Sequence, residues 1–278
     1  MKKIILCSFI FIFNLNCDPQ KFVIGSRLDG FFSNFLGTLT NIIWAERNNK
    51  IPVVSWERSL YFQPEGYNES NNVWEYYFEP VSKLKKIKDD IVYSNYYSPD
   101  KFGINAWSDL AYNSTYRSLF NSIIKKYVKI KPNIQNTINA FYKKNMQGKT
   151  NIGIHIRGTD KFTEISRVNS KKILDYANQL AQNFGKKCQF FIATDEENII
   201  KLAQSCLSSK VVFYDAHRSN NSNPVWKVFK QNKALLGEEI LIESQLLSKC
   251  DYFIHTISNV SIAVCYFNPS LKNILLKN

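Results

Sequence analysis

The sequence predicts an α/β protein whose β-sheets are parallel and doubly wound. Short apolar runs of strand length alternate with longer segments of helical periodicity through the second half of the 278-residue chain. The first half opens in the same way, with a strand, a glycine-containing loop, a helix and a second strand. Such alternation favours crossover connections, which place consecutive strands parallel in one sheet.

Helical spacing and short apolar runs define the elements expected in the first half. The best helix has apolar residues along one face, namely Leu36, Leu39, Ile42, Ile43 and Trp44. The stretch at residues 61–97 is aromatic and irregular. In chain order we expect a strand at 22–25, a turn at 29–34, a helix at 35–47, a strand at 51–56, and helices at 116–128 and 134–144.

The second half is more regular. Strands are expected at residues 151–157, 188–193, 211–214, 252–255 and 273–276. Helices are expected at 171–184, 198–207 and 236–247, and a last one is capped by Ser258-Asn259. Thr194 and Glu197 have the spacing of a capping box before the second of these helices. The polar segment 146–150 separates the halves, so we predict domains at 22–148 and 149–278.

Residues 1–21 are predicted to form a targeting or anchoring segment. Lys2-Lys3 precedes an apolar run at residues 4–13 and then a polar stretch, which is typical of a secretory signal and short for a membrane span. This predicts a protein of the secretory pathway or a periplasm, with possible membrane association through this segment. If the segment is instead an irregular first strand, the protein is cytoplasmic.

The formal net charge of +13 favours anionic partners such as phosphorylated ligands, a membrane face or nucleic acid, although a solvated lysine-rich surface would give the same value. The basic residues are scattered and no arginine-rich motif occurs, so we expect no nucleic-acid partner. The sequence contains no P-loop, no GxGxxG after an opening strand and no Asp-x-Asp. Its cysteines form no CxxC pair, so no metal site is expected.

Polar side chains follow the predicted strands of the second half at the point where each strand ends. Arg157 follows the first strand, Asp195 the second, His217 and Arg218 lie beyond the third, and Thr256 follows the fourth. The carboxyl ends of parallel strands meet at one edge of a sheet, where such folds bind ligands. Arginine binds diphosphates through a planar fork of donors, and a helix beginning after Ser258 offers N–H groups to the same anion. Together these residues predict a nucleotide site.

The sequence also resembles a known family. His155, Arg157, Thr159, Asp160 and Lys161 match the His-x-Arg-x-Thr-Asp-Lys signature of the α1,6-fucosyltransferases, which include the N-glycan core enzymes and the rhizobial nodulation enzymes. Residues 190–195 and 246–258 are similar to two further stretches of that family. The loop at 29–34 looks like its N-terminal loop, which faces the donor. The similarity covers most of residues 150–270.

This resemblance implies a GT-B fold, in which two Rossmann-like domains with parallel sheets face a cleft. The domain 22–148 would then lie on the acceptor side, and the domain 149–278 would bind the nucleotide sugar. The implied enzyme is a glycosyltransferase that moves fucose from GDP-fucose to a hydroxyl of a glycan acceptor, inverting and metal-independent. It would need no cofactor other than this donor substrate.

The resemblance also implies roles for individual residues. Arg157 would hold the β-phosphate, with His155 supporting that pocket, and Glu243 would contact the guanine. The full set around the donor is Asn34, His155, Arg157, Asp160, Asp195, Glu243, Thr256 and Ser258. Lys161 and Glu164 would lie on the acceptor side, where Glu164 is the candidate base.

Two departures from the family pattern leave alternatives open. Many members have a second arginine where this chain has Gly158, and the spacing from Asp160 to Glu164 is one residue shorter than in the family. The α1,2-fucosyltransferases share a shorter form of the signature, so it does not fix the linkage. The alternatives are another nucleotide-sugar transferase of the same fold and a non-catalytic carbohydrate-binding protein.

Overall fold

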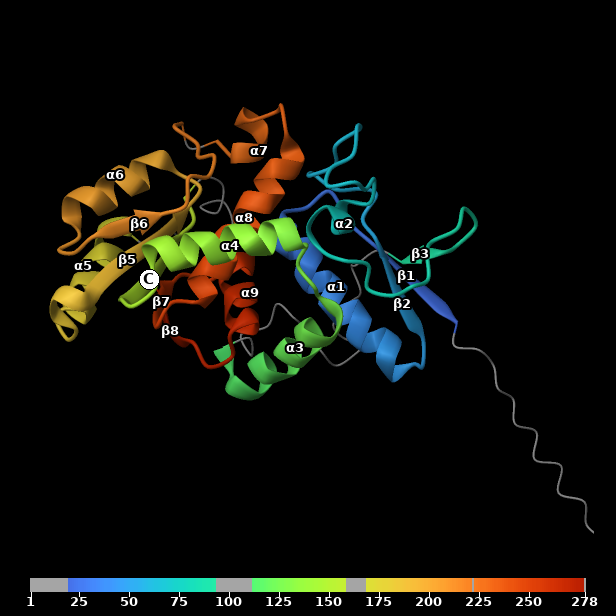
Figure 1. Cartoon of the computed structure of the whole chain (residues 1–278), viewed down its shortest axis with the longest axis horizontal. Coiled ribbons are helices and arrows are strands. Elements are labelled where there is room, and N and C mark those ends of the chain that lie inside the picture. The colour runs from blue at the N-terminus through green and yellow to red at the C-terminus, as the bar shows by residue number, and fades with distance from the viewer. Residues whose placement is uncertain (1–19, 94–111, 159–168, 222, 278) are drawn as a thin grey trace, which may run out of the picture.

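A computed structural model describes residues 20–93, 112–158, 169–221 and 223–277. Within the described residues, two parallel sheets lie toward opposite ends of the molecule, and helices lie between them (Figure 1). The larger sheet has the strand order β6-β5-β4-β7-β8. Its strands are β4 (Thr150–Ile156), β5 (Cys188–Thr194), β6 (Val211–Phe213), β7 (Tyr252–His255) and β8 (Lys272–Leu275). The predicted parallel sheet of the second half is confirmed.

The smaller sheet has the order β2-β1-β3 and is also parallel. Its strands are β1 (Lys21–Gly25), β2 (Ile51–Ser55) and β3 (Val92–Tyr93). Helix α1 (Phe31–Arg47) is the crossover between β1 and β2. The five residues of β1 run in register with β2, so both strands end at the same edge of the sheet.

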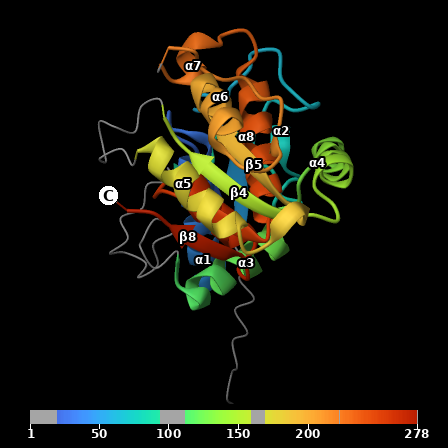
Figure 2. The ribbon, with the colours of Figure 1, turned by 90° about the vertical axis from the view of Figure 1, so that its left-hand side faces the viewer.

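Helices cover both faces of the larger sheet (Figure 2). α5 (Ser170–Ala181) and α6 (Glu197–Cys206) pack on one face and enclose a core that includes Phe190 of β5. α8 (Lys233–Ser248) and α9 (Asn259–Phe267) pack on the other face, toward which Phe191 points. Successive strand residues point to opposite faces, so the continuous apolar run of β5 fits a strand buried on both sides.

The core on the α8 and α9 face continues into the N-terminal half. α1 and α3 (Ser114–Tyr127) pack against α9, while α4 (Pro132–Asn145) and α2 (Val73–Tyr77) pack against α8. The short α7 (Val225–Val228) lies beside the start of α8. One apolar cluster therefore joins α1, α8 and α9, and it holds the two sheets in a fixed relation.

Three local predictions differ from the structure. α1 begins at Phe31 rather than at residue 35, because Gly30 is its N-cap and Phe31 and Phe32 are buried in the core. The predicted capping box of Thr194 does not form, because Thr194 still belongs to β5 and α6 starts after Glu196 without a side-chain cap. The aromatic stretch at 61–97, expected to be irregular, contains α2 and β3.

No helix within the described ranges has the length and apolar character needed to cross a bilayer. The predicted signal or anchor segment lies almost entirely in residues 1–19, outside the described residues.

Candidate active site

A cleft of about 490 Å³ lies where the two halves face each other. From the N-terminal half it is lined by residues 28–33, Leu60 and Tyr61. From the C-terminal half its polar lining consists of His155, Arg157, Thr194, Asp195, His217, Glu239, Glu243 and Asn259. These residues follow, or lie close to, the carboxyl ends of β4, β5, β6 and β7. The crossovers diverge between β4 and β7, and such a switch point is where open α/β sheets bind ligands.

Residues at the end of β4 bring an imidazole and a guanidinium into the cleft. His155 is buried in β4 and lies in register with His255 of β7, and Arg157 follows directly after the strand. Burial lowers the pKa of His155 to about 3, with Arg157 and then His255 adding to the effect. His155 is therefore neutral at physiological pH, and the fixed positive charge here is that of Arg157.

The N-terminus of α9 opens on the same part of the cleft. Ser258 is its N-cap and forms a reciprocal capping box with Ser261: the Ser258 hydroxyl accepts from the Ser261 N–H at 3.0 Å, and the Ser261 hydroxyl accepts from the Ser258 N–H at 2.9 Å. The Ser258 hydroxyl also lies 3.5 Å from Nδ1 of His155. This capping leaves Asn259 and Val260, in the first turn, to line the cleft.

Ser258 and Thr256, both predicted to contact the donor, support the start of α9. Ser258 is 1% exposed, and its hydroxyl serves the helix. The Thr256 carbonyl accepts from the Ser261 hydroxyl at 2.8 Å and lies 3.1 Å from Nδ1 of His255. Neither residue belongs to the cleft lining, and their contact with the donor stays a prediction.

Asp195 lines the cleft after β5 and forms hydrogen bonds to the loop after β4 and to the loop after β6. Its carboxylate accepts from the Gly158 N–H at 2.8 Å, and its carbonyl accepts from the Ser219 N–H at 2.9 Å. A Cβ atom added at Gly158 would collide with the buried carboxylate of Glu196. A larger residue at this position would therefore have to displace the carboxylate at the end of the Glu196 side chain.

Two acidic residues of α8 face the cleft one helical turn apart, and each pairs with a basic residue beyond β6. Glu243 accepts from Arg218 at 2.8 Å, and this pair is almost fully buried. Arg218 also donates to two backbone carbonyls. Burial raises the pKa of Glu243 to about 8, against the opposing effect of Arg218, and Glu239 and Asp195 raise it further. Glu243, the predicted guanine contact, therefore lines the cleft with a carboxyl group whose pKa lies above its ordinary value.

The second pair is more open to the cleft. Glu239 accepts from the backbone N–H of His217 at 3.0 Å, and its other oxygen lies 2.7 Å from Nδ1 of the same residue. The His217 ring packs on Phe229, with ring centroids 3.9 Å apart, and its side chain is 39% exposed. Sequence reasoning noted His217 at a strand end but missed Glu239. The four-residue spacing from Glu243 along one helix was the available signal.

Asn34 does not line the cleft, although the sequence predicted it near the donor. It is 1% exposed, its side-chain oxygen accepts from the Arg27 N–H at 2.8 Å, and its amide donates to the carbonyls of Arg27 and Asp29 at 3.1 and 3.2 Å. Asn34 therefore shapes the loop before α1, and the cleft is lined by the loop itself.

Asp160, Lys161 and Glu164 lie outside the described residues, so the predicted acceptor side and base are not placed.

Comparison with known proteins identifies the family. The family model for alpha-(1,6)-fucosyltransferase N- and catalytic domains matches residues 115–268, which is more than half of the chain. The chain belongs to the α-(1,6)-fucosyltransferase family. It is thus a glycosyltransferase of the fucosyltransferase type, as the signature around Arg157 predicted. No curated protein sequence matches this chain.

Solved structures agree on the fold. NodZ α-1,6-fucosyltransferase from Bradyrhizobium, co-crystallised with GDP, is 18% identical with a TM-score of 0.56, over 89% of this chain and 91% of that chain. POFUT1 in complex with GDP is 11% identical with a TM-score of 0.54, over 93% and 98%. A mutant of Arabidopsis thaliana FUT1 in complex with GDP is 9% identical with a TM-score of 0.57, over 94% and 72%. The predicted GT-B fold of the fucosyltransferases is confirmed.

Proposed function

We propose that this fucosyltransferase moves fucose from GDP-fucose to a hydroxyl of a glycan acceptor, with inversion at the anomeric carbon and without a metal ion or other cofactor. The observation that carries the proposal is the convergence of Arg157, neutral His155 and the first turn of α9 on one cleft. NodZ soaked with GDP-fucose and POFUT1 in complex with GDP-fucose share the fold of this chain, which supports this donor.

The diphosphate is proposed to lie between Arg157 and the N-terminus of α9. A guanidinium can bind two phosphate oxygens at once, and the first N–H groups of a helix carry partial positive charge. A neutral His155 can donate one hydrogen bond to the same anion without adding a second buried charge. Because the sequence has no Asp-x-Asp, these groups are the proposed counter-charge for the leaving GDP.

The nucleoside is proposed to lie toward the ends of β5 and β6, where Asp195, Glu243 and the His217–Glu239 pair line the cleft. The Watson–Crick edge of guanine presents two N–H donor groups, which carboxylate oxygens can accept. Glu243 is the proposed guanine contact. The ring of His217 offers its Nε2 atom to a ribose hydroxyl, because Nδ1 is already engaged by Glu239.

The proposed reaction is one in-line displacement. The acceptor oxygen forms a bond to the anomeric carbon while the bond from that carbon to the β-phosphate oxygen breaks, and GDP leaves with the electron pair. As the family resemblance implies, Glu164 is the proposed base for the proton of the acceptor hydroxyl, Lys161 is proposed to act on the acceptor side and Asp160 on the donor side. Charge that develops on the β-phosphate is stabilised by Arg157 and α9.

The test is Arg157→Ala, assayed by GDP release and by transfer to a glycan acceptor. We expect kcat/KM to fall roughly a hundred- to thousandfold, equivalent to ~2.7–4 kcal/mol, because one preorganised donor to the developing charge is lost. Lys144→Ala, which removes an exposed cation of α4, is the matched control and is expected to have no effect. Near-normal turnover by Arg157→Ala, with an unchanged melting temperature, would refute the assignment.

A donor panel separates the alternatives. GDP-fucose, GDP-mannose and a UDP-sugar are offered to the parent protein, and nucleotide release is measured. Turnover of GDP-fucose alone supports the proposal. Turnover of another donor identifies a different transferase of the same fold, and glycan binding without any nucleotide release identifies a carbohydrate-binding protein.

A further inference from the structure

The segment between α2 and β3 exposes an unusual number of large apolar side chains. The described residues contain eight exposed large apolar side chains, and four of them fall between residues 84 and 92. Their exposed fractions are 41% for Leu84, 61% for Ile87, 72% for Ile91 and 40% for Val92. Single exposed apolar residues are normal on soluble proteins, but a group of this size in nine residues marks a contact surface.

Lysines alternate with these apolar side chains. Lys83, Lys85, Lys86 and Lys88 occupy four of the six positions from 83 to 88, and all except Lys86 are exposed. We call residues 83–92 the lysine–isoleucine loop. Because its positive and apolar side chains are interleaved rather than segregated, any single partner that covers the loop contacts both kinds of group.

Asp90 holds the loop in place. Its carboxylate accepts from the Ile87 N–H at 2.7 Å and from the Lys21 ammonium at 2.8 Å, and Lys21 also donates to the Lys85 carbonyl at 3.4 Å. Lys86 forms an ion pair with Glu57. The acidic group of Asp90 is thus neutralised inside the loop, and the outward charges are Lys83, Lys85 and Lys88 against Asp89 alone.

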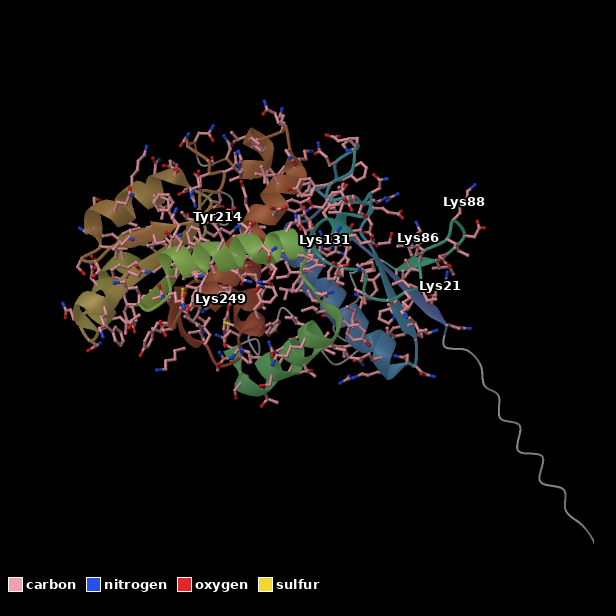
Figure 3. The ribbon with its side chains drawn as sticks, viewed as in Figure 1. Lys21, Lys86, Lys88, Lys131, Tyr214 and Lys249 are labelled. Atoms are coloured by element: carbon pink, nitrogen blue, oxygen red, sulfur yellow. The ribbon has the colours of Figure 1, made fainter. Side chains whose placement is uncertain are left out.

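The loop lies beside β1 of the smaller sheet, and none of its residues lines the cleft. Asp90 and Lys85 contact Lys21 at the start of β1, and Val92 pairs with Val23 in the middle of that strand. Lys86 reaches Glu57, which lies just beyond the carboxyl end of β2. Lys21, Lys86 and Lys88 lie together at this end of the molecule (Figure 3).

We propose that the lysine–isoleucine loop docks on the surface of an anionic phospholipid bilayer. Leu84, Ile87 and Ile91 would enter the boundary between headgroups and acyl chains, while the outward lysines would contact lipid phosphates and carboxylates. Because no residue of the loop lines the cleft, docking of the loop leaves the cleft lining uncovered. A partner bound by charge alone, such as an acidic protein or a nucleic acid, would leave the exposed Ile87 and Ile91 side chains in water.

The test uses the full chain and two sets of vesicles, one of phosphatidylcholine alone and one with about a third phosphatidylserine. Co-sedimentation is measured for the parent, for Lys83→Glu/Lys85→Glu/Lys88→Glu, and for Ile87→Ser/Ile91→Ser. Lys143→Glu/Lys144→Glu on α4 is the matched control, since both lysines are exposed there without apolar neighbours of this kind. Transfer to a soluble acceptor is measured in parallel, because no residue of the loop lines the cleft.

We expect the parent and the α4 control to bind the anionic vesicles, and each loop variant to bind them at least about tenfold more weakly, with solution transfer unchanged. If both loop variants bind like the parent, another part of the chain carries the binding and the proposal is wrong. If only the lysine variant loses binding, the partner is a polyanion rather than a bilayer, and the proposal is also wrong. These outcomes do not depend on the identity of the sugar donor.

Discussion

The two walls of the cleft differ in chemistry. The C-terminal wall carries the ionisable groups His155, Arg157, Asp195 and Glu243, whereas the N-terminal wall is mostly backbone and apolar surface from residues 28–33, Leu60 and Tyr61. Asp29 is the acidic exception in this N-terminal lining, and it is paired with Arg27. This difference supports the proposal that the C-terminal wall binds the anionic donor, while the N-terminal wall gives the cleft its shape.

Packing in the two walls explains how this division is built. Two hydrogen bonds hold the N-terminal loop. The Asn34 side-chain oxygen accepts from the Arg27 N–H, and the Tyr61 hydroxyl accepts from the Phe31 N–H at 3.2 Å. The C-terminal groups are held by each other, as in the paired interactions of α8 with Arg218 and His217. Changes to the C-terminal wall should therefore alter donor binding, and changes to the N-terminal wall should alter stability first.

After the loss of Arg157, the largest effect on donor binding is expected from Gly158→Arg. The new side chain must displace the buried Glu196 carboxylate, whose neighbour Asp195 accepts from the Gly158 N–H. Overpacking of this kind costs about 1–3 kcal/mol, or ~5- to 150-fold in GDP affinity if the displacement reaches Asp195. The measurement is GDP titration by calorimetry.

The double variant Gly158→Arg/Glu196→Ala is the control. Removing the Glu196 carboxylate makes room for the arginine, so GDP affinity should return toward that of the parent. If Gly158→Arg alone binds GDP as well as the parent does, Glu196 is not what excludes a second arginine here.

A smaller effect is expected from the charge state of Glu243. Its pKa of about 8 means that the side chain is mostly neutral at pH 7, and the ionised form accepts two N–H groups of guanine better than the neutral form. GDP affinity should therefore rise with pH, by about eightfold between pH 7 and 8.5 for one group with this pKa. Glu243→Gln should remove this dependence; a parent whose GDP affinity is flat over the same range would contradict the role of Glu243.

The sequence predicted the strands of the larger sheet to within one residue at each end, because those strands are continuous apolar runs with polar ends. It missed the start of α1, since Gly30 before two phenylalanines looks like a turn. It also failed at Thr194, whose sequence spacing to Glu197 fits a cap but whose backbone pairs with Ile156 in the sheet. Pairing between strands decides such cases, and local spacing does not contain it.

In the candidate site, too, local sequence patterns predicted some residues and missed those that depend on distant contacts. Arg157 and Asp195 were predicted because they follow strands, and His155 was predicted from the family signature; all three line the cleft. Glu239 was missed because its partner His217 is 22 residues away, and only its four-residue spacing from Glu243 in α8 indicated that it faces the same cleft. Asn34 and Ser258 were found by their motifs, but their positions outside the cleft lining depend on hydrogen bonds that only the folded chain provides.

The smallest effect on donor binding is expected from Asn34→Ala, which tests the N-terminal wall directly. The substitution leaves the Arg27 N–H and two carbonyls without their partner, so the free energy of unfolding should fall by about 1–3 kcal/mol. Asn41→Ala is the matched control, since this buried asparagine of the same helix donates to the Gly37 carbonyl within α1 and does not line the cleft. If Asn34 only supports the loop, both variants should lower the melting temperature while GDP affinity at 20 °C changes less than it does for Glu243→Gln at pH 8.5. A large loss of GDP affinity in Asn34→Ala with unchanged stability would instead mean that the amide reaches the donor, and the two walls would then share the binding of the nucleotide.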